Sequence, residues 1–166
     1  MPKASDRLQA SIRELLESQN TMTLATCGPD GPWAAAVFFA SDAGLNLYFV
    51  SDPRTRHGCD LMATERAAAA VHPDCNAWGE IRGLQLEGAV APLDGDAREA
   101  ALKRYLVKFP QVRRLEEQPR EGDETVIATH LRQATLFRLI PERIRLIDNR
   151  RRFGFKAELV LHEGAA

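Results

Sequence analysis

The sequence predicts a mainly β protein of the α+β class, a small antiparallel β-barrel with helices packed around it. Segments that alternate apolar and polar residues recur about six times, and turn residues separate them. The early segments are joined by short turns, which predicts a hairpin order. The few amphipathic stretches suit helices at the periphery of a barrel. At 166 residues the chain is expected to form one domain over residues 1–166.

The first part of the chain predicts a helix followed by a meander of three strands. Residues 5–19 place Leu8 and Ile12 on one apolar stripe. Ser5 can cap this helix at its start. The motif GPDG at residues 28–31 is strong turn chemistry between β-branched segments. The three strands are expected at residues 21–27, 33–40 and 45–51.

The rest of the chain mixes clear and ambiguous segments. Asp52 can cap a helix with Pro53 at its first position, running to about residue 64. The run RAAAAVH fits either a helix or a buried strand. In order, we expect that ambiguous segment at 66–72, a loop at 73–80, a strand at 81–93, a helix at 95–108, a charged surface excursion at 110–123, strands at 134–140 and 143–148 on either side of Pro141, and a basic tail at 149–166.

Composition and charge exclude several classes of function. A net charge of −1 and a pI near 6.4 provide no basic field for nucleic acid. The N-terminal stretch contains no long apolar run, so neither a signal peptide nor a membrane span is expected, and the protein is expected in the cytoplasm. Cys27, Cys59 and Cys75 match no metal-binding spacing, and we expect three reduced thiols and no metal site.

Residues 46–57 have the order of elements that creates an anion site, a strand followed by a basic turn and a helix. The turn supplies the Thr55 hydroxyl, the guanidinium groups of Arg54 and Arg56, and the titratable ring of His57. Backbone N–H groups at the start of the helix point the same way and add partial positive charge. A phosphate suits such a place, and the alternative is a solvated helix start.

Four segments resemble the FMN-binding split β-barrels related to pyridoxamine 5′-phosphate oxidase. They are GPWAAAVFF, LYFVSDPRTRHGCDL, IRGLQLEGAVAPL and FRLIPERIRLIDN, and together they span roughly residues 20–150. The last two, with YLVKFP and DNRRRFGFK, are most similar to a small, largely uncharacterised bacterial subgroup. The resemblance implies a six-stranded antiparallel split β-barrel with peripheral helices that binds FMN.

The resemblance also implies which residues bind the cofactor. In the phosphate clamp, His57 replaces the usual lysine, so its charge would depend on pH. An arginine on the flavin-side strand is replaced by Ala35, and the glutamine near the ring is replaced by Gly83. Gln85 lies on the same face as Gly83 and either reaches the flavin or lines the barrel. The implied cofactor-binding residues are Ala35, Ala36 and Val37 through their backbone groups, Val50, Ser51, Thr55, Arg56, His57 and Gln85.

The closing hairpin argues against oxidation of pyridoxamine phosphate. The stretch that grips the vitamin in those oxidases corresponds to Arg152–Lys156, which lacks the histidine and the final arginine. The ring-contacting tryptophan of that hairpin becomes Ile147. Phe153 and Phe155, interleaved with cations, either cover a ligand or belong to a frayed basic terminus.

We therefore expect an FMN-dependent oxidoreductase resembling a flavin reductase, with a small-molecule electron donor such as a nicotinamide and a small-molecule acceptor. The alternatives are a non-catalytic protein that binds flavin, haem or deazaflavin, and a dimeric barrel without a cofactor. The resemblance implies a homodimer with cofactor sites at the interface, where Trp78 reaches a bound ring or the partner, or simply packs. His72, His130 and His162 show no catalytic spacing.

Overall fold

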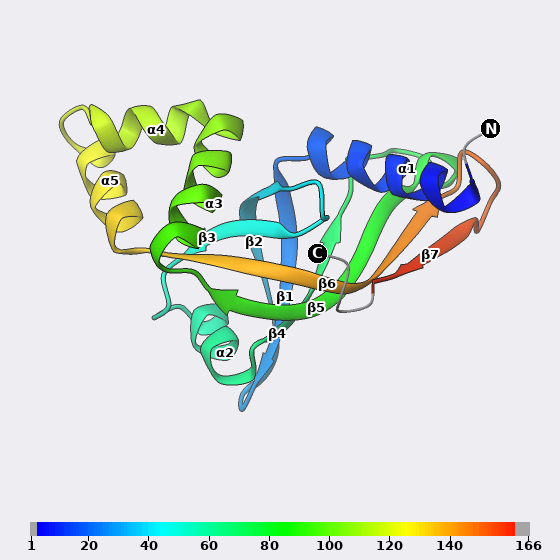
Figure 1. The fold of residues 1–166 in the computed structure, drawn as a ribbon, viewed down its shortest axis with the longest axis horizontal. Coiled ribbons are helices and arrows are strands. Elements are labelled where there is room, and N and C mark those ends of the chain that lie inside the picture. Colours follow the sequence, from blue (N-terminus) through cyan, green and yellow to red (C-terminus); the bar gives the residue numbers. More distant parts are fainter. Residues whose placement is uncertain (1–2, 162–166) are drawn as a thin grey trace.

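Seven strands form one antiparallel sheet in the computed structural model, which describes residues 3–161 (Figure 1). Their order is β3-β2-β1-β4-β5-β6-β7, and an additional pairing of β3 with β6 closes the first six into a barrel. This confirms the mainly β split barrel. The strands are β1 (Thr21–Gly28), β2 (Gly31–Ser41), β3 (Leu47–Ser51), β4 (Arg66–Val71), β5 (Arg82–Pro92), β6 (Thr135–Asp148) and β7 (Lys156–Val160).

The helices lie outside the barrel. Figure 1 shows α1 and α2 on opposite sides of it, and α3 to α5 gathered at one end. Within residues 3–161, no helix has both the length and the apolar character needed to cross a membrane. The helices are α1 (Ala4–Ser18), α2 (Arg56–Thr64), α3 (Gly95–Lys108), α4 (Pro110–Glu117) and α5 (Asp123–Gln133), with a short 3-10 helix, η1 (Trp78–Glu80).

The core fills the barrel because alternate strand residues point inward. In β1 the inward set includes Met22 and Leu24, whereas Thr21 and Thr23 are exposed on the outer face. The apolar stripe of α1 covers one side of this core. Members of the core from α1 are Ile12, Leu15 and Leu16, and those from the later strands include Phe39, Phe49, Leu84, Phe137, Ile144 and Leu146.

Strand β4 resolves an ambiguity in the sequence, and strand β6 differs from the expected pair of strands. The ambiguous alanine run is strand β4, because its alternate residues are buried against β1 and β5. The prediction that Pro141 separates two strands is wrong, since β6 is continuous through it. A register irregularity between Glu87 and Gly88 of β5 accommodates the proline. Gly88 is required there, because an added Cβ would collide with the carbonyl group of Ile140.

The charged surface excursion expected at 110–123 is helical over most of its length, because α4 occupies it without burying a residue and α5 follows. Pro110 stands at the start of α4, where its missing N–H costs nothing. The expected basic tail at 149–166 contains a strand, β7, which pairs with β6 after a hairpin. Residues 162–166, including His162, lie outside the described residues.

Helix caps differ from the expected ones at both early helices. Helix α1 begins one residue before Ser5, with Lys3 as its cap residue and the Lys3 N–H donating to Asp6 Oδ2 at 3.0 Å. Helix α2 is capped by Thr55, so the prediction of an Asp52 cap with Pro53 in the first turn is wrong. The cap change matters for function because it places a hydroxyl at the start of α2.

Replacing Lys108 with methionine is expected to destabilise the fold by about 1–3 kcal/mol. Lys108 Nζ donates to the carbonyl oxygens of Leu16 and Gln19 at 3.1 and 2.7 Å, and it lies 4.3 Å from the ring centroid of Phe39. Methionine fills the space but leaves those carbonyls without a donor. Urea denaturation measures the loss. The exposed Lys103→Met is the control, and equal stabilities of the two variants would contradict the assigned role.

Candidate functional site

Three polar side chains converge at the turn between β3 and α2. The hydroxyl oxygen of Ser51, a buried residue at the end of β3, lies 2.6 Å from Nε2 of His57. The hydroxyl oxygen of Thr55 lies 3.3 Å from the same nitrogen. The predicted members Ser51, Thr55 and His57 are therefore brought together, and we call these three residues the Ser51–His57 cluster.

The Thr55 hydroxyl is engaged in holding the turn. It donates to the carbonyl oxygen of Asp52 at 2.7 Å and accepts the N–H of Gly58 at 3.2 Å, which is the helix cap. An added Cβ at Gly58 would collide with the backbone of Asp52 and Pro53, so the chain is folded tightly here. The next N–H along the helix, that of Cys59, donates to the carbonyl oxygen of Thr55 at 2.8 Å.

The two arginines of the turn point away from the Ser51–His57 cluster. Arg54 forms an exposed ion pair with Asp52 at 2.7 Å. Arg56 donates to the carbonyl oxygen of Asp30 at 2.9 Å, and its guanidinium carbon lies 4.5 Å from the ring centroid of Trp33. The role of Arg56 as a phosphate ligand stays a prediction that requires a change of side-chain conformation.

The ring of His57 is half-buried, and this controls its charge. Burial lowers the pKa of His57, and the nearby carboxylate of Asp60 raises it, with burial the larger effect. Asp60 is itself buried, and its Oδ2 accepts a hydrogen bond of 2.7 Å from the Thr26 hydroxyl of β1. The pKa of His57 therefore lies below its ordinary value, so burial favours the neutral ring.

Strand β2 has an open edge beside α2. It pairs with β1 along Gly31–Phe38 but with β3 only along Phe39–Ser41. Among the described residues no strand pairs with the other edge of Ala35–Val37, so alternate backbone groups there are directed away from the sheet. Helix α2 contacts β1 and β2, which places this edge near the turn. The side chains of Ala35 and Val37 are half-buried, and Ala36 is exposed on the opposite face.

The remaining predicted residues lie elsewhere. Val50 packs against the apolar cluster that contains Tyr105 and Phe109, on the side of α3. Gln85 is exposed on the outer face of β5, separated from β2 by β1 and β4. That separation is about 14 Å at roughly 4.8 Å per strand. One chain therefore does not bring Gln85 to the Ser51–His57 cluster.

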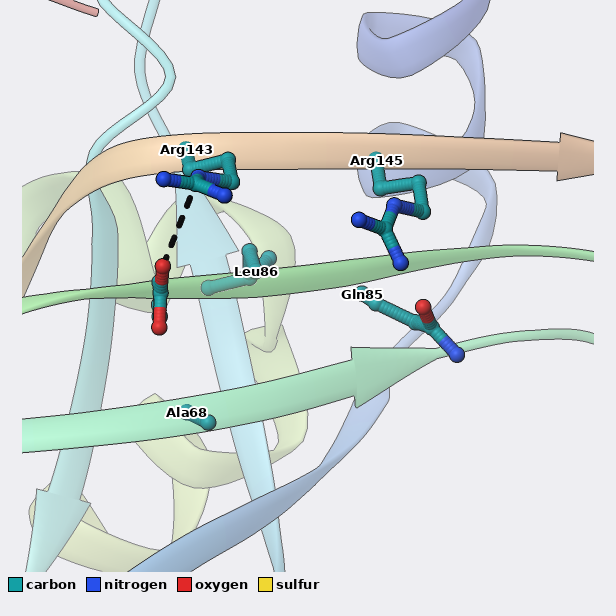
Figure 2. A pocket seen from close by; sticks show the side chains of 6 residues that line it. Ala68, Gln85, Leu86, Arg143 and Arg145 are labelled. Atoms are coloured by element: carbon teal, nitrogen blue, oxygen red, sulfur yellow. Dashed lines mark ion pairs between the residues drawn. The ribbon is translucent and has the colours of Figure 1, made fainter. Parts of the chain in front are cut away.

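Gln85 instead borders a shallow depression of about 330 Å³ on the outer face (Figure 2). Figure 2 shows Arg143 and Arg145 of β6 projecting over it from the adjacent strand. Arg143 lies 3.5 Å from Glu87, and Arg145 lies 2.9 Å from Glu158. The paired charges balance, so this depression carries no strong preference for an anion.

Two cations of the closing hairpin, Arg150 and Arg151, are used within the fold. Asp148 is only 3% exposed in its side chain and lies 3.1, 3.5 and 3.6 Å from Arg150, Arg151 and Arg82. Phe155 lies under the guanidinium of Arg151, with 5.2 Å from its carbon to the ring centroid. These residues fix the hairpin in place, and they are not free to face a ligand phosphate.

Two aromatic side chains of neighbouring loops are exposed, Trp78 by 77% and Phe153 by 73%. Asn149 connects the loops, because its Nδ2 donates to the carbonyl oxygen of Trp78 at 2.7 Å and its Oδ1 accepts the N–H of Gly154 at 2.9 Å. The Asp148-Asn149 pair is thus a turn element. Trp78 is too exposed to be a residue that simply packs in the core.

Metal-binding groups are absent from the part of the chain between residues 3 and 161, where no three His, Cys, Asp or Glu side chains lie close enough to hold an ion. All three cysteines are free and exposed, as expected for reduced thiols. Sequence reasoning missed Trp33, Asp30 and Asp60. Asp60 stands three residues after His57 on one helix face, a spacing that could have identified it.

The chain is similar in sequence to a known protein family and to bacterial relatives. The family model described as pyridoxamine 5′-phosphate oxidase matches residues 8–145. A UPF0306 protein of Klebsiella pneumoniae (strain 342) is 30% identical over 150 residues, which cover 89% of each chain. A UPF0306 protein of Photorhabdus laumondii is 29% identical over 100 residues, covering 60% of this chain and 70% of that protein.

Solved structures share the fold at low identity. A haem-binding protein from Mycobacterium smegmatis superposes with a TM-score of 0.71 at 20% identity, covering 96% of this chain and 59% of that one. The haem storage protein HutZ from Vibrio cholerae has a TM-score of 0.57 at 19% identity, covering 81% and 90%. Because the family model matches most of the sequence and the barrel agrees with it, the chain belongs to the pyridoxamine 5′-phosphate oxidase family.

Proposed function

We propose that the protein is an FMN-binding oxidoreductase of this family and not a pyridoxamine phosphate oxidase. The observation that carries the proposal is the open edge of β2 next to the Ser51–His57 cluster. A phosphate at the cluster would leave the flavin ring along that edge. The unpaired backbone groups of Ala35, Ala36 and Val37 would then bond its pyrimidine part.

The donor set of the turn suits a phosphate. Ser51 supplies a hydroxyl, His57 a titratable ring, and the start of α2 the backbone N–H groups of Arg56 and His57. Arg56 can add a bidentate contact if it leaves Asp30 and Trp33. The exchange is favourable, because a phosphate offers a full negative charge in place of a carbonyl dipole and a ring face.

A bound flavin would supply two-electron redox chemistry, and the protein would supply position and access. The small side chains at Ala34–Ala36 leave room for a flat ring to approach the backbone. The closing hairpin would not hold a pyridoxamine phosphate, because Arg150 and Arg151 are bound to Asp148. The electron donor we expect is a nicotinamide.

A second copy of the chain is the partner we propose for the outer sheet face. Small residues line that face along β2, β1 and β4, and none of the described helices covers them. In a homodimer joined there, Gln85 of one copy would complete the site of the other. The small outer-face residues include Thr23, Ala25, Ala34, Ala36 and Ala68.

Replacing Arg56 with alanine is expected to weaken FMN binding by about 1.5–3 kcal/mol, because a charged hydrogen bond to the phosphate is lost. Arg54→Ala is the matched control, since Arg54 already pairs with Asp52 in an exposed position. FMN titrations followed by flavin absorbance measure both. Equal affinities of the Arg56 and Arg54 variants would remove Arg56 from the phosphate site.

Turnover is tested on the flavin-loaded protein. Addition of NADH or NADPH without oxygen is expected to bleach the oxidised-flavin absorbance, and an added acceptor restores it. A loaded protein that neither nucleotide reduces would contradict the oxidoreductase proposal while leaving flavin binding intact.

Haem binding is the second candidate function, and one feature of His72 favours it. Nδ1 of the exposed His72 ring lies 3.2 Å from the carbonyl oxygen of Pro73. Donation from Nδ1–H leaves Nε2 as the lone-pair nitrogen, the form in which imidazole ligates a metal. Two proteins of the same fold are named for haem.

Titration with hemin tests this second candidate. A shifted Soret band that is lost in His72→Ala and kept in His130→Ala would support His72 as the axial ligand, because His130 is exposed on a separate helix. Identical spectra of both variants would exclude His72.

A further inference from the structure

The hydroxyl protons of the Ser51–His57 cluster depend on the charge of the ring. Thr55 donates its proton to the carbonyl oxygen of Asp52 at 2.7 Å, so towards His57 it can only accept. The Ser51 hydroxyl, 2.6 Å from Nε2, has no other partner among the described residues. The Ser51 proton is thus the one that can change direction.

In the tautomer that leaves Nε2 without a proton, protonation of the ring reverses the hydrogen bond to Ser51. An Nε2 without a proton accepts the Ser51 O–H, which then offers nothing to a ligand. In the imidazolium both nitrogens carry protons, so Nε2–H donates to the Ser51 oxygen and the Ser51 O–H turns outward. One added proton therefore supplies a cation and a free hydroxyl donor together, and both favour a bound anion.

We propose that FMN binding takes up one proton on His57, so that the affinity for FMN falls as the pH rises above neutrality. This inference rests on the proposed function, because it concerns the same phosphate site. The proton comes from solvent and adds to the unprotonated ring nitrogen, and no other bond forms or breaks. A lysine at this position would bring its charge without proton uptake.

The surroundings of His57 on α2 and β1 favour a neutral ring in the free protein. Burial lowers the pKa of His57 more than the carboxylate of Asp60 raises it. The Asp60 charge is shared with the Thr26 hydroxyl, which donates to it at 2.7 Å. Arg56, on the same helix, is drawn towards Asp30 and Trp33 and not towards the ring.

Charged groups on the other elements near His57 add nothing to the two effects on its pKa, burial and the carboxylate of Asp60. At the end of β3, Asp52 is paired with Arg54 at 2.7 Å. His130 of α5 lies near enough to contribute to the lowered pKa of Asp52, whose main cause is the hydrogen bond from Arg54. Strand β2 carries no titratable side chain from Trp33 to Val37. A phosphate is thus the anion that would bring His57 to its charged form.

The sign of the pH effect follows from the protons counted before and after binding. Above the second phosphate pKa of about 6, free FMN is mainly a dianion. Burial favours the neutral form of the His57 ring in the free protein. The complex holds one more proton than its separate parts. The dissociation constant therefore rises by up to about tenfold per pH unit from pH 7 until the pKa of His57 in the complex is passed.

Calorimetric titration with FMN tests the proposal, at about pH 7 and pH 8.5 and in two buffers of different ionisation enthalpy. We expect the wild-type protein to take up close to one proton per FMN at about pH 7 and to bind several-fold more weakly at about pH 8.5. His57→Lys is expected to bind with no proton uptake and no pH dependence over this range. Riboflavin, which lacks the phosphate, is the ligand control.

The outcomes separate the inference from the proposed function. FMN binding by the wild-type protein without proton uptake, and with the same affinity at both pH values, would overturn the inference alone. An equal pH dependence for riboflavin would also overturn it, because the effect would not come from the phosphate. Failure of both the wild-type protein and His57→Lys to bind FMN would overturn the proposed function and the inference with it.

Discussion

Replacing Asp148 with asparagine is expected to lower the free energy of unfolding by about 3 kcal/mol. The change removes the buried charge that faces the guanidinium of Arg82, whose side chain is 10% exposed. The cost stays near the lower end for a broken buried ion pair because Glu14 still holds Arg82 with two bonds of 2.9 Å. Arg150 and Arg151 also lose their anchor, so the β6–β7 hairpin loosens.

Urea denaturation with a shared slope measures this loss, and Glu142→Gln is the control. Glu142 forms an ion pair with Arg66 at 2.8 Å in which both side chains are exposed, so its loss is expected to cost less than about 1 kcal/mol. A stability of Asp148→Asn equal to that of Glu142→Gln would show that the buried charge contributes nothing.

Acid should reduce the difference between Asp148→Asn and the wild-type protein. Burial raises the pKa of Asp148, but the hydrogen bond and charge of Arg150 and the charge of Arg82 lower it further, below the ordinary value of 3.8. A carboxylate with a lowered pKa stabilises the fold above its ordinary pKa and loses that contribution as the pH falls through the folded-state value. The wild-type protein should therefore lose more stability than the variant below about pH 4.

Replacing Gly88 with alanine is expected to cost about 3 kcal/mol or more, which is large for one methyl group. The added Cβ would meet the backbone of Ile140 and Pro141 on β6, and backbone cannot yield as a flexible side chain can. The two strands would have to separate at the irregularity that lets β6 pass through Pro141.

Thermal unfolding followed by circular dichroism measures the effect of Gly88→Ala. Gly79→Ala is the control, because an added Cβ there has no atom within 4 Å. A melting temperature of Gly88→Ala as high as that of the control would show that β5 and β6 accommodate the added methyl group without separating.

The barrel could be predicted because its strands carry their own pattern. The alternation along β1 follows which residues point into the barrel, and the turn at residues 28–31 marks the hairpin between β1 and β2. Both signals lie within short stretches of the sequence. Strand β6 could not be predicted as continuous, because Pro141 is tolerated only through Gly88 of another strand. Helix α4 was missed since its charged sequence buries no residue of its own.

The candidate site shows the same division between local and distant information. The order of strand, turn and helix predicted the meeting of Thr55 and His57, and the fold places Ser51 with them. The position of Arg56 depends on Trp33, which is far away in sequence and comes close only when β2 pairs with β1. Such a contact leaves no periodic signal in the chain.

The central claim is that the Ser51–His57 cluster binds the phosphate of FMN, and the ratio of riboflavin to FMN dissociation constants tests it most directly. The two ligands share the ring system and differ in the phosphate. At about pH 6.5 we expect FMN to bind at least tenfold more tightly, since one charged hydrogen bond contributes about 1.5–3 kcal/mol. Equal affinities, or binding of neither ligand, would contradict the claim.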